Sequence, residues 1–241
     1  MKNSIKISNI DEFYRKRTIE LNKFFFEQSK EKILSNFENI EEDAEAFQTN
    51  WIAQNDSCYS PEQDPAAFFE KTQEESVEFY LKLKELRNNT YLSSLSALYF
   101  DWDKTVRNTL IQILKDEDLL PLETQSFILS KGFVDIMNLF IGLGWDIKSE
   151  NFYVILKKYS TVVNVYRHGY GRSFKRLKQE YPEFIRRDFE ECDIDFAMCT
   201  ELILSDANLQ EFSDAVISFW SKMPEFFLIK EENEKNLPDW F

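Results

Sequence analysis

Residues 162–173, which read VVNVYRHGYGRS, contain the only histidine of this 241-residue chain. On an α-helix, Asn164 and His168 would lie one turn apart on the same face, because residues four positions apart are neighbours there. Imidazole exchanges protons near neutral pH more readily than other side chains, so His168 is a candidate general acid or base. The spacing therefore predicts an Asn–His pair that can handle a proton at one end of a helix.

Positive charge surrounds this pair. One arginine directly precedes the histidine, and further basic residues follow it within ten positions. Such side chains supply the charge that a phosphate group or an RNA backbone requires, and amides near two glycines and at the start of the next helix could add hydrogen-bond donors. The pattern predicts catalytic roles for Asn164, Arg167 and His168, and a phosphate- or RNA-binding group made of Arg172, Ser173, Lys175 and Arg176.

The same stretch also fits a simple turn between two helices. Gly169 stands where a left-handed residue usually ends a helix, and Gly171 offers a second position with a permissive backbone. Arg167 and His168 would then face the negative end of the helix dipole, which contributes ~0.3–1 kcal/mol per charge. Ser173 would cap the helix that follows. The turn interpretation and the functional interpretation are both open from the sequence.

The Asn164-x-x-x-His168 element, at the end of a late helix in a helical chain, resembles the signature of the HEPN superfamily. That superfamily carries Arg-Asn-x-x-x-His or a relaxed Arg-x(4–6)-His. The resemblance covers roughly residues 150–185. It implies metal-independent RNA cleavage, in which the histidine acts on the ribose 2′-hydroxyl, an arginine holds the phosphate, and two copies meet across a homodimer. It further implies a bacterial toxin or a phage-defence component.

The superfamily's arginine position is occupied by Val163 in this chain. Arg167 is one candidate replacement, and it lies about 100° around the helix from His168. Arg172, beyond the turn, is the other candidate. A non-catalytic relative of the superfamily is the alternative that this departure leaves open. The longer string N-x-x-R-H-G-x-G-x-S also resembles a pattern in uncharacterised bacterial helical proteins, which implies no particular activity.

The elements that must position these residues are helices. Nearly every segment repeats apolar residues at three- and four-residue steps, as amphipathic helices do. We therefore predict an all-α fold, a single helical-bundle domain of about seven or eight helices over residues 1–230, followed by a polar C-terminal tail over 231–241. The predicted helices cover 10–40, 66–88, 91–115, 124–142 or 124–144, 150–168, 173–180 and 206–223, and residues 41–55 either extend the first helix or form another. Ser8 or Asn9 is the predicted first N-cap and Asp206 the last, and no clear strand pattern is visible in 183–204.

The chain is acidic, with a net charge of −14, but one segment is strongly basic. Residues 157–187, the basic island, hold nine Lys or Arg against two acidic residues, a net charge of +7, so the other 210 residues carry −21. The overall charge argues against a general nucleic-acid coat and against a membrane-surface protein. The island supports a second hypothesis: a non-catalytic helical adaptor whose basic 157–187 segment docks an acidic protein partner or the chain's own acidic surface.

Other kinds of site are not indicated. The chain has no phosphate-binding P-loop, no dinucleotide fingerprint and no hydrolase elbow, so no cofactor is expected. His168 with Cys192 and Cys199 lacks the spacing of a metal site, and together with Cys58 these cysteines indicate free thiols. The sequence has no signal-peptide pattern and no apolar run of ~18 residues, so we expect a cytoplasmic protein without a membrane segment.

Overall fold

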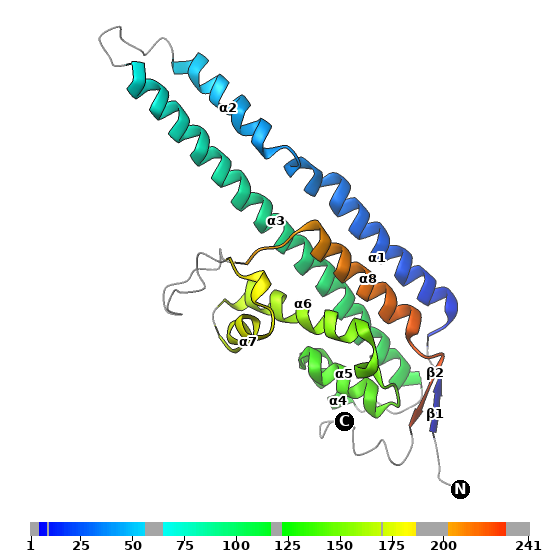
Figure 1. Cartoon of the computed structure of the whole chain (residues 1–241). Coiled ribbons are helices and arrows are strands. Elements are labelled where there is room, and N and C mark those ends of the chain that lie inside the picture. The colour runs from blue at the N-terminus through cyan, green and yellow to red at the C-terminus, as the bar shows by residue number, and fades with distance from the viewer. Residues whose placement is uncertain are drawn as a thin grey trace.

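A single helix, α3 (Pro65–Asp116), runs through most of the length of the molecule (Figure 1). The structure, a computed structural model, describes residues 5–8, 10–55, 65–116, 122–169, 171–186 and 202–229, and the predicted tail 231–241 lies outside these ranges. With 52 residues, α3 is roughly 78 Å long at about 1.5 Å per residue. The sequence pattern predicted two helices here, over 66–88 and 91–115. They are one helix because no Gly or Pro follows Pro65 in the segment, and the Thr90 hydroxyl donates to the Leu86 carbonyl at 2.7 Å.

Seven further α-helices and one small ladder complete the described part of the chain. The helices are α1 (Glu12–Lys32), α2 (Ile40–Asn55), α4 (Leu122–Ser130), α5 (Phe133–Gly142), α6 (Asn151–His168), α7 (Arg172–Glu180) and α8 (Asp206–Lys222). Short 3₁₀ turns are η1 (Leu34–Phe37), η3 (Ile147–Ser149) and η4 (Pro182–Phe184). The strands β1 (Ile5–Ser8) and β2 (Phe226–Ile229) pair antiparallel. The predicted all-α helical bundle is confirmed, and the ladder is an addition that no alternation pattern predicted.

The first predicted helix, 10–40, is divided and begins at a different cap. Its N-cap is Asp11 rather than Ser8 or Asn9, and the Asp11 carboxylate accepts the Tyr14 N–H at 2.6 Å. Ser8 belongs to β1, so the chain is still extended there, and Asn9 lies outside the described residues. The turn η1 separates α1 from α2, so the second helix that the sequence allowed is formed.

The apolar segment predicted as one helix over 124–144 is also divided. Gly132 has an extended backbone (φ −74°, ψ 170°) and is the N-cap of α5. Its carbonyl accepts the N–H groups of Asp135 and Ile136 at 3.1 and 3.2 Å, which starts a new helix. α4 and α5 are therefore separate helices, and α5 ends at Gly142, one of the two predicted residues.

The sequence predicted Asp206 as the N-cap of the last helix, but Asp206 is the first helical residue of α8. Ser205 is the N-cap, and its N–H donates to the side-chain oxygen of Asn208 at 2.9 Å. The Asp206 carboxylate has other partners: it accepts the Tyr91 hydroxyl at 3.0 Å and pairs with Lys30 at 3.3 Å. This carboxylate therefore links α8 to α3 and α1.

The hydrophobic core lies where α3 passes α5, α6 and α8. At its centre Trp102 is 2% exposed. Its ring centroid lies 5.5 Å from that of Phe219, 5.7 Å from that of Tyr99 and 6.2 Å from that of Phe133. Aromatic pairs in such tilted or edge-on geometries contribute about 0.5–1.5 kcal/mol beyond the area that they bury. The many aromatic residues of the chain are thus used to fasten α6 and α8 to α3.

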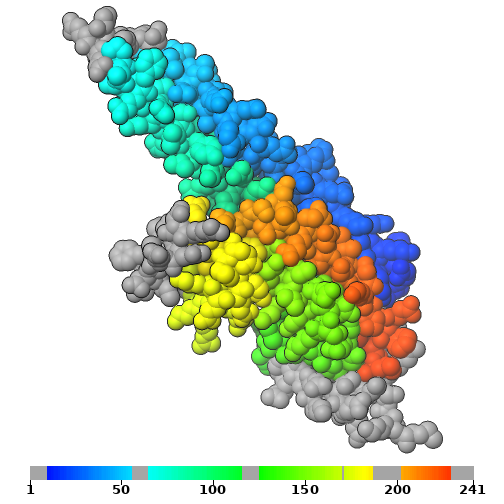
Figure 2. Space-filling view, viewed as in Figure 1, coloured from blue at the N-terminus to red at the C-terminus, as the bar shows by residue number. Residues whose placement is uncertain are grey.

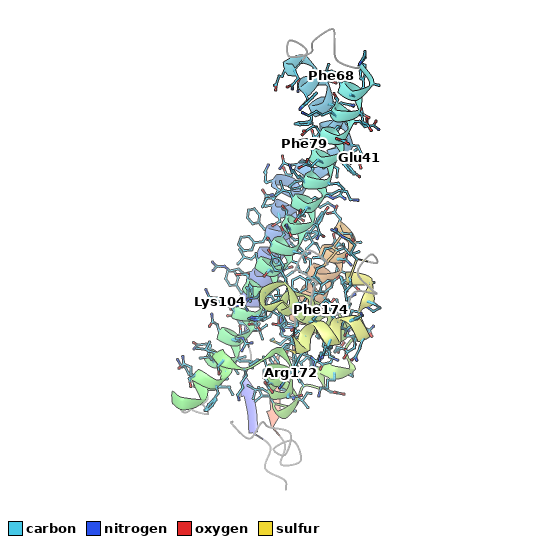
Figure 3. The ribbon with its side chains drawn as sticks, turned by 90° about the vertical axis from the view of Figure 1, so that its left-hand side faces the viewer. Glu41, Phe68, Phe79, Lys104, Arg172 and Phe174 are labelled. Atoms are coloured by element: carbon cyan, nitrogen blue, oxygen red, sulfur yellow. The ribbon has the colours of Figure 1, made fainter. Side chains whose placement is uncertain are left out.

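Beyond this core, α2 and residues 65–80 of α3 project as a two-helix arm (Figures 1 and 2). The rings of Phe47 and Phe79 stack at 4.3 Å with an interplanar angle of 8°, and Trp51 lies 5.6 Å from Phe68. Figure 3 shows Phe68 and Phe79 along the arm, and Arg172 and Phe174 on the body. The residues with candidate chemistry therefore belong to the body and not to the arm.

Candidate functional site

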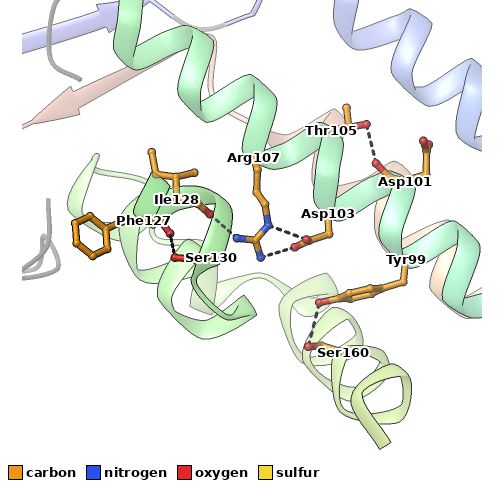
Figure 4. Close-up of polar contacts among 9 residues, drawn as sticks. All are labelled: Tyr99, Asp101, Asp103, Thr105, Arg107, Phe127, Ile128, Ser130 and Ser160. Carbon is orange, nitrogen blue, oxygen red and sulfur yellow. Dashed lines mark hydrogen bonds and ion pairs between the residues drawn. The ribbon is translucent and has the colours of Figure 1, made fainter. Parts of the chain in front are cut away.

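Helix α6 is fixed to the body along most of its length. Its inward side chains are fully or almost fully buried, namely Phe152, Leu156, Tyr159, Val162, Val163 and Val165. The Tyr99 hydroxyl donates to the Ser160 hydroxyl at 3.1 Å (Figure 4). One and a half turns later, the hydroxyls of Tyr166 and Ser93 are hydrogen-bonded at 2.9 Å. The last turn of α6 is therefore held against α3, and this positions the residues that follow.

Asn164 and His168 occupy the outward face of the last turns of α6, as predicted. Asn164 is half-buried and His168 is exposed. Within the described residues, neither side chain has a hydrogen bond or an ion pair with another group. The imidazole is therefore accessible to a molecule that approaches this helix end.

The turn after His168 depends on one glycine. Gly169 has φ 65° and ψ −140°, and its N–H donates to the Val165 carbonyl at 2.8 Å, so it ends α6 as predicted. Its ψ differs from that of the usual left-handed cap, and the combination is one that essentially only glycine adopts. Gly171 has φ 174° and ψ −156°, an extended backbone, and a Cβ there would meet nothing within 4 Å. The permissive backbone that the sequence offered at Gly171 is therefore not used for a left-handed conformation.

Helix α7 presents a basic face at this turn. Phe174 and Leu177 are buried, while Arg172, Lys175 and Arg176 are exposed. The N-cap is Gly171, which has no side chain to accept a hydrogen bond, and the predicted cap Ser173 lies inside the first helical turn. Helix N-termini attract anions because their first N–H groups lack partners in the helix. We call His168 and residues 171–175 the α6–α7 corner.

The two candidates for the missing arginine have different surroundings. Arg167 lies with its guanidinium carbon 4.4 Å from the ring centroid of Phe100 on α3, a cation–π contact. Arg172 has no hydrogen bond or ion pair within the described residues. Val163 is 1% exposed and faces the core, so the superfamily's arginine position points away from solvent in this chain. Of the two, Arg172 is the side chain that is free to meet an anion.

Part of the charge of the basic island is neutralised by carboxylates. Lys158 pairs with Glu211 at 2.6 Å, and Lys157 with Glu180 at 3.2 Å. Arg176 lies 3.8 Å from the same Glu180. Exposed pairs such as Arg176–Glu180 contribute little to stability, at about 0–1 kcal/mol each, and all three pairs reduce the local positive potential. Among the described residues of the island, Arg167, Arg172, Lys175 and Arg186 have no carboxylate partner.

The Lys158–Glu211 pair belongs to a structural network behind the corner. The Tyr159 hydroxyl donates to the same Glu211 carboxylate at 2.5 Å. Burial, followed by this hydrogen bond, raises the pKa of Tyr159 well above its ordinary value, so the phenol remains protonated at neutral pH. This arrangement connects α6 to α8 and lacks the exposed geometry of an acid–base site.

The described residues contain neither a metal-binding cluster nor a membrane-spanning helix. Within them, no group of three or more His, Cys, Asp or Glu side chains is placed to hold a metal ion. The three cysteines, Cys58, Cys192 and Cys199, lie outside those ranges, as does Arg187 of the island. None of the helices described is both long and apolar enough to cross a membrane.

Sequence patterns did not identify every residue that shapes the corner. The contact of Arg167 with Phe100 was not predicted, nor was the Tyr166–Ser93 hydrogen bond. The sequence did hint at the Arg167–Phe100 contact, because Phe100 is an aromatic residue outside the buried stripe that contains Tyr99. The second joins residues more than seventy positions apart, and helical periodicity carries no information on such pairs.

No protein-family model, no curated protein sequence and no solved structure matches the chain. The resemblance to the HEPN superfamily therefore rests on its short motif alone and stays a prediction. What the arrangement can do chemically follows from the corner itself: an exposed imidazole at the end of α6, and, at the start of α7, a helix N-terminus without a side-chain cap and cations that have no ion pair within the described part of the chain.

Proposed function

We propose that the α6–α7 corner binds the phosphate backbone of RNA, and that His168 transfers the proton needed to cleave it without a metal ion. One observation carries the proposal. Arg172 and Lys175 are exposed and unpaired within the described residues, and they follow the exposed His168 by four and seven residues in a chain that is otherwise acidic. Phosphate groups are the natural ligands of arginine and lysine beside a helix N-terminus.

The chemistry assigned to His168 is a proton transfer at the ribose. As a base, the imidazole would accept the proton of the 2′-hydroxyl, and the 2′-oxygen would attack the adjacent phosphorus. The bond from phosphorus to the 5′-oxygen would break, leaving a 2′,3′-cyclic phosphate, and the 5′-oxygen would take a proton from water. Arg172 and the first N–H groups of α7 would hold the phosphate oxygens, where negative charge develops. Asn164, one turn before His168, would position the ribose or the imidazole.

The experiment is incubation of the purified protein with end-labelled RNA in EDTA, with wild type beside His168→Ala. We expect cleavage by the wild type and none by the variant, while RNA retention is nearly unchanged because the phosphate-binding cations remain. Equal cleavage by both proteins contradicts the role of His168. RNA retention without cleavage by either protein leaves the binding function and removes the catalytic one, as in a non-catalytic relative of the superfamily. A bacterial toxin or phage-defence role follows only if cleavage is found.

A specific observation favours the adaptor hypothesis as the second candidate. Glu211 of α8 already pairs with Lys158 of the basic island, which is what docking of the island on the chain's own acidic groups predicts. A helical adaptor of this kind would show no salt-sensitive retention of RNA. Phosphate binding must weaken as salt rises, so a salt series separates the two functions.

A further inference from the structure

A cavity of about 670 Å³ lies where α3 leaves the body to form the arm. Its described lining comes from α3, from the residue two positions after η4, and from the segment before α8. The side chains that give it chemical character are Leu81, Lys84, Glu85, Arg87, Arg186 and Ile203. The volume is within the range of about 300–1,000 Å³ that is usual for sites of small ligands.

Hydrogen bonds hold the two walls of this cavity together. The Asn88 side chain on α3 donates to the Leu202 carbonyl and accepts the Leu204 N–H at 3.2 Å. The Ile203 N–H donates to the Phe184 carbonyl at 2.9 Å, and Ile185 and Leu202 form a β-bridge. Because backbone groups on both sides are paired, the cavity is a formed feature of the fold rather than a gap between loosely placed side chains.

Three cations and one carboxylate line the cavity: Lys84, Arg87, Arg186 and Glu85. Lys84 and Arg87 are three residues apart on α3, so they are neighbours on its surface. Glu85 is two residues from Arg87, which puts it about 200° away around the helix. Arg186 contributes a second guanidinium from the opposite wall, and neither arginine has a hydrogen bond or ion pair within the described residues. The Lys84 ammonium lies 5.6 Å from the Tyr80 ring centroid.

Apolar surface completes the cavity. Leu81 is 55% exposed and Ile203 is 38% exposed, which is high for large apolar side chains that line one site.

Two guanidinium groups and an ammonium fit the oxygens of a phosphate dianion, which arginine binds in a bidentate manner. A planar apolar group would cover Leu81 and Ile203, and the Glu85 carboxylate would accept a hydrogen bond from a hydroxyl on the far side.

We infer that this cavity binds a phosphate monoester attached to an apolar, hydroxyl-bearing body: a nucleotide, either free or as the 5′-phosphorylated end of an RNA. Arg87 and Arg186 hold the phosphate, Leu81 and Ile203 contact the base, and Glu85 accepts a sugar hydroxyl. The site is distinct from the α6–α7 corner and does not require that the corner cleaves or binds RNA.

Calorimetric titration of the whole protein with adenosine 5′-monophosphate tests this inference, with adenosine and inorganic phosphate titrated in parallel. We expect the monophosphate to bind more tightly than either fragment. Arg87→Gln and Arg186→Gln should each weaken it about tenfold or more, the usual effect of removing a charged hydrogen-bond partner. Lys82→Gln is the matched control, because Lys82 is an exposed cation on α3 that pairs with Glu78 at 2.6 Å and does not line the cavity.

The outcomes are distinct. No heat with the monophosphate, or equal binding of the monophosphate and adenosine, overturns the inference, as does unchanged affinity in both arginine variants with native circular dichroism. Competition with a 5′-phosphorylated and a 5′-hydroxyl RNA of the same sequence then separates the two sources. Stronger binding of the phosphorylated RNA that the monophosphate displaces identifies an RNA end, and binding of the monophosphate alone identifies a free nucleotide. Failure of the corner variant Arg172→Gln to bind RNA has no bearing on this result.

Discussion

Gly169 has a backbone conformation (φ 65°, ψ −140°) that residues with a Cβ rarely adopt. Gly169→Ala should therefore lower the free energy of unfolding by about 1–3 kcal/mol. Gly171→Ala is its matched control, because its extended backbone has open space for a Cβ, and we expect a change within about 0.5 kcal/mol. Urea denaturation followed by circular dichroism measures both. Equal losses in the two variants would show that the turn does not depend on the conformation of Gly169.

The ion pair between Asp103 and Arg107 is the most enclosed one described in the molecule (Figure 4). Two guanidinium nitrogens donate to the carboxylate, at 2.7 and 2.9 Å, and a third donates to the Ile128 carbonyl of α4. Asp103→Asn removes the negative charge and leaves a nearly buried arginine without its counter-ion. We expect a loss of about 2–4 kcal/mol in the free energy of unfolding.

Asp101→Asn is the control for that measurement. Asp101 is exposed two residues earlier on α3, and within the described residues only its backbone carbonyl has a side-chain partner, the Thr105 hydroxyl at 2.7 Å. Its replacement should change stability by no more than about 0.5 kcal/mol. If the two substitutions cost the same, the contact of Arg107 with Asp103 contributes nothing specific to the attachment of α4.

Tyr91 makes stability sensitive to alkaline pH. Burial, and then its hydrogen bond to Asp206, raise the pKa of Tyr91 to about 12 from an ordinary value of 10.0. Because the folded pKa is the higher one, the protonated phenol stabilises the fold fully below pH 10, and this contribution is lost as pH rises from 10 toward 12. The urea midpoint of Tyr91→Phe should thus be lower than that of the wild type at pH 8, and the difference should shrink at pH 11. A difference that grows with pH would contradict the assignment.

At the scale of elements, the arm should open more easily than the body. It consists of two helices that are joined by aromatic pairs and by the hydrogen bonds of Ser76 to Ala44 and of Tyr80 to Glu41. By contrast, α6 is covered by both α3 and α8. Phe79→Ala removes the stack with Phe47, and we expect faster amide hydrogen exchange in 40–55 and 65–80 with little change in α5, α6 and α8. Val77→Ala is the control, since Val77 is 51% exposed. Uniform acceleration throughout the chain would show that the arm and the body unfold together.

Helical periodicity predicted the all-α class and the extent of α6 and α7 closely, because their apolar residues recur at three- and four-residue steps. It failed where the decisive factor lay outside periodicity. The absence of Gly and Pro makes α3 one helix, and the extended backbone at Gly132 divides α4 from α5. The strands β1 and β2 pair across more than two hundred residues and have no local signature.

The candidate site could be predicted in part, because helical spacing and a glycine at a helix end are visible in the sequence. Asn164 and His168 share a face because their spacing is helical, and Gly169 ends α6 because its conformation needs glycine. The use of Arg167 in a contact with Phe100 could not be predicted, since it depends on how α6 lies against α3. The cavity that contains Arg87 and Arg186 likewise joins segments about a hundred residues apart.

At the scale of the whole molecule, the distribution of charge distinguishes the two proposed functions, RNA binding at the corner and a non-catalytic adaptor. Glu180 and Glu211 pair with three cations of the basic island, whereas Arg172 and Lys175 at the start of α7 have no ion pair within the described residues. Single-stranded RNA releases about 0.7 counterions for each phosphate that a protein neutralises. The RNA binding proposed for the corner should therefore have a measurable salt dependence, although the protein as a whole is acidic.

The most direct test of the central claim is the affinity for labelled single-stranded RNA in EDTA across a salt series. Wild type is compared with the double variant Arg172→Gln, Lys175→Gln, and with the control Arg17→Gln, Lys23→Gln, which removes two exposed cations from α1. We predict that the corner variant binds more weakly and that its slope of log affinity against log salt falls by roughly 1.4, the effect of two lost phosphate contacts, while the control matches the wild type. Unchanged affinity and slope in the corner variant, or no RNA binding by the wild type at low salt, would contradict the claim.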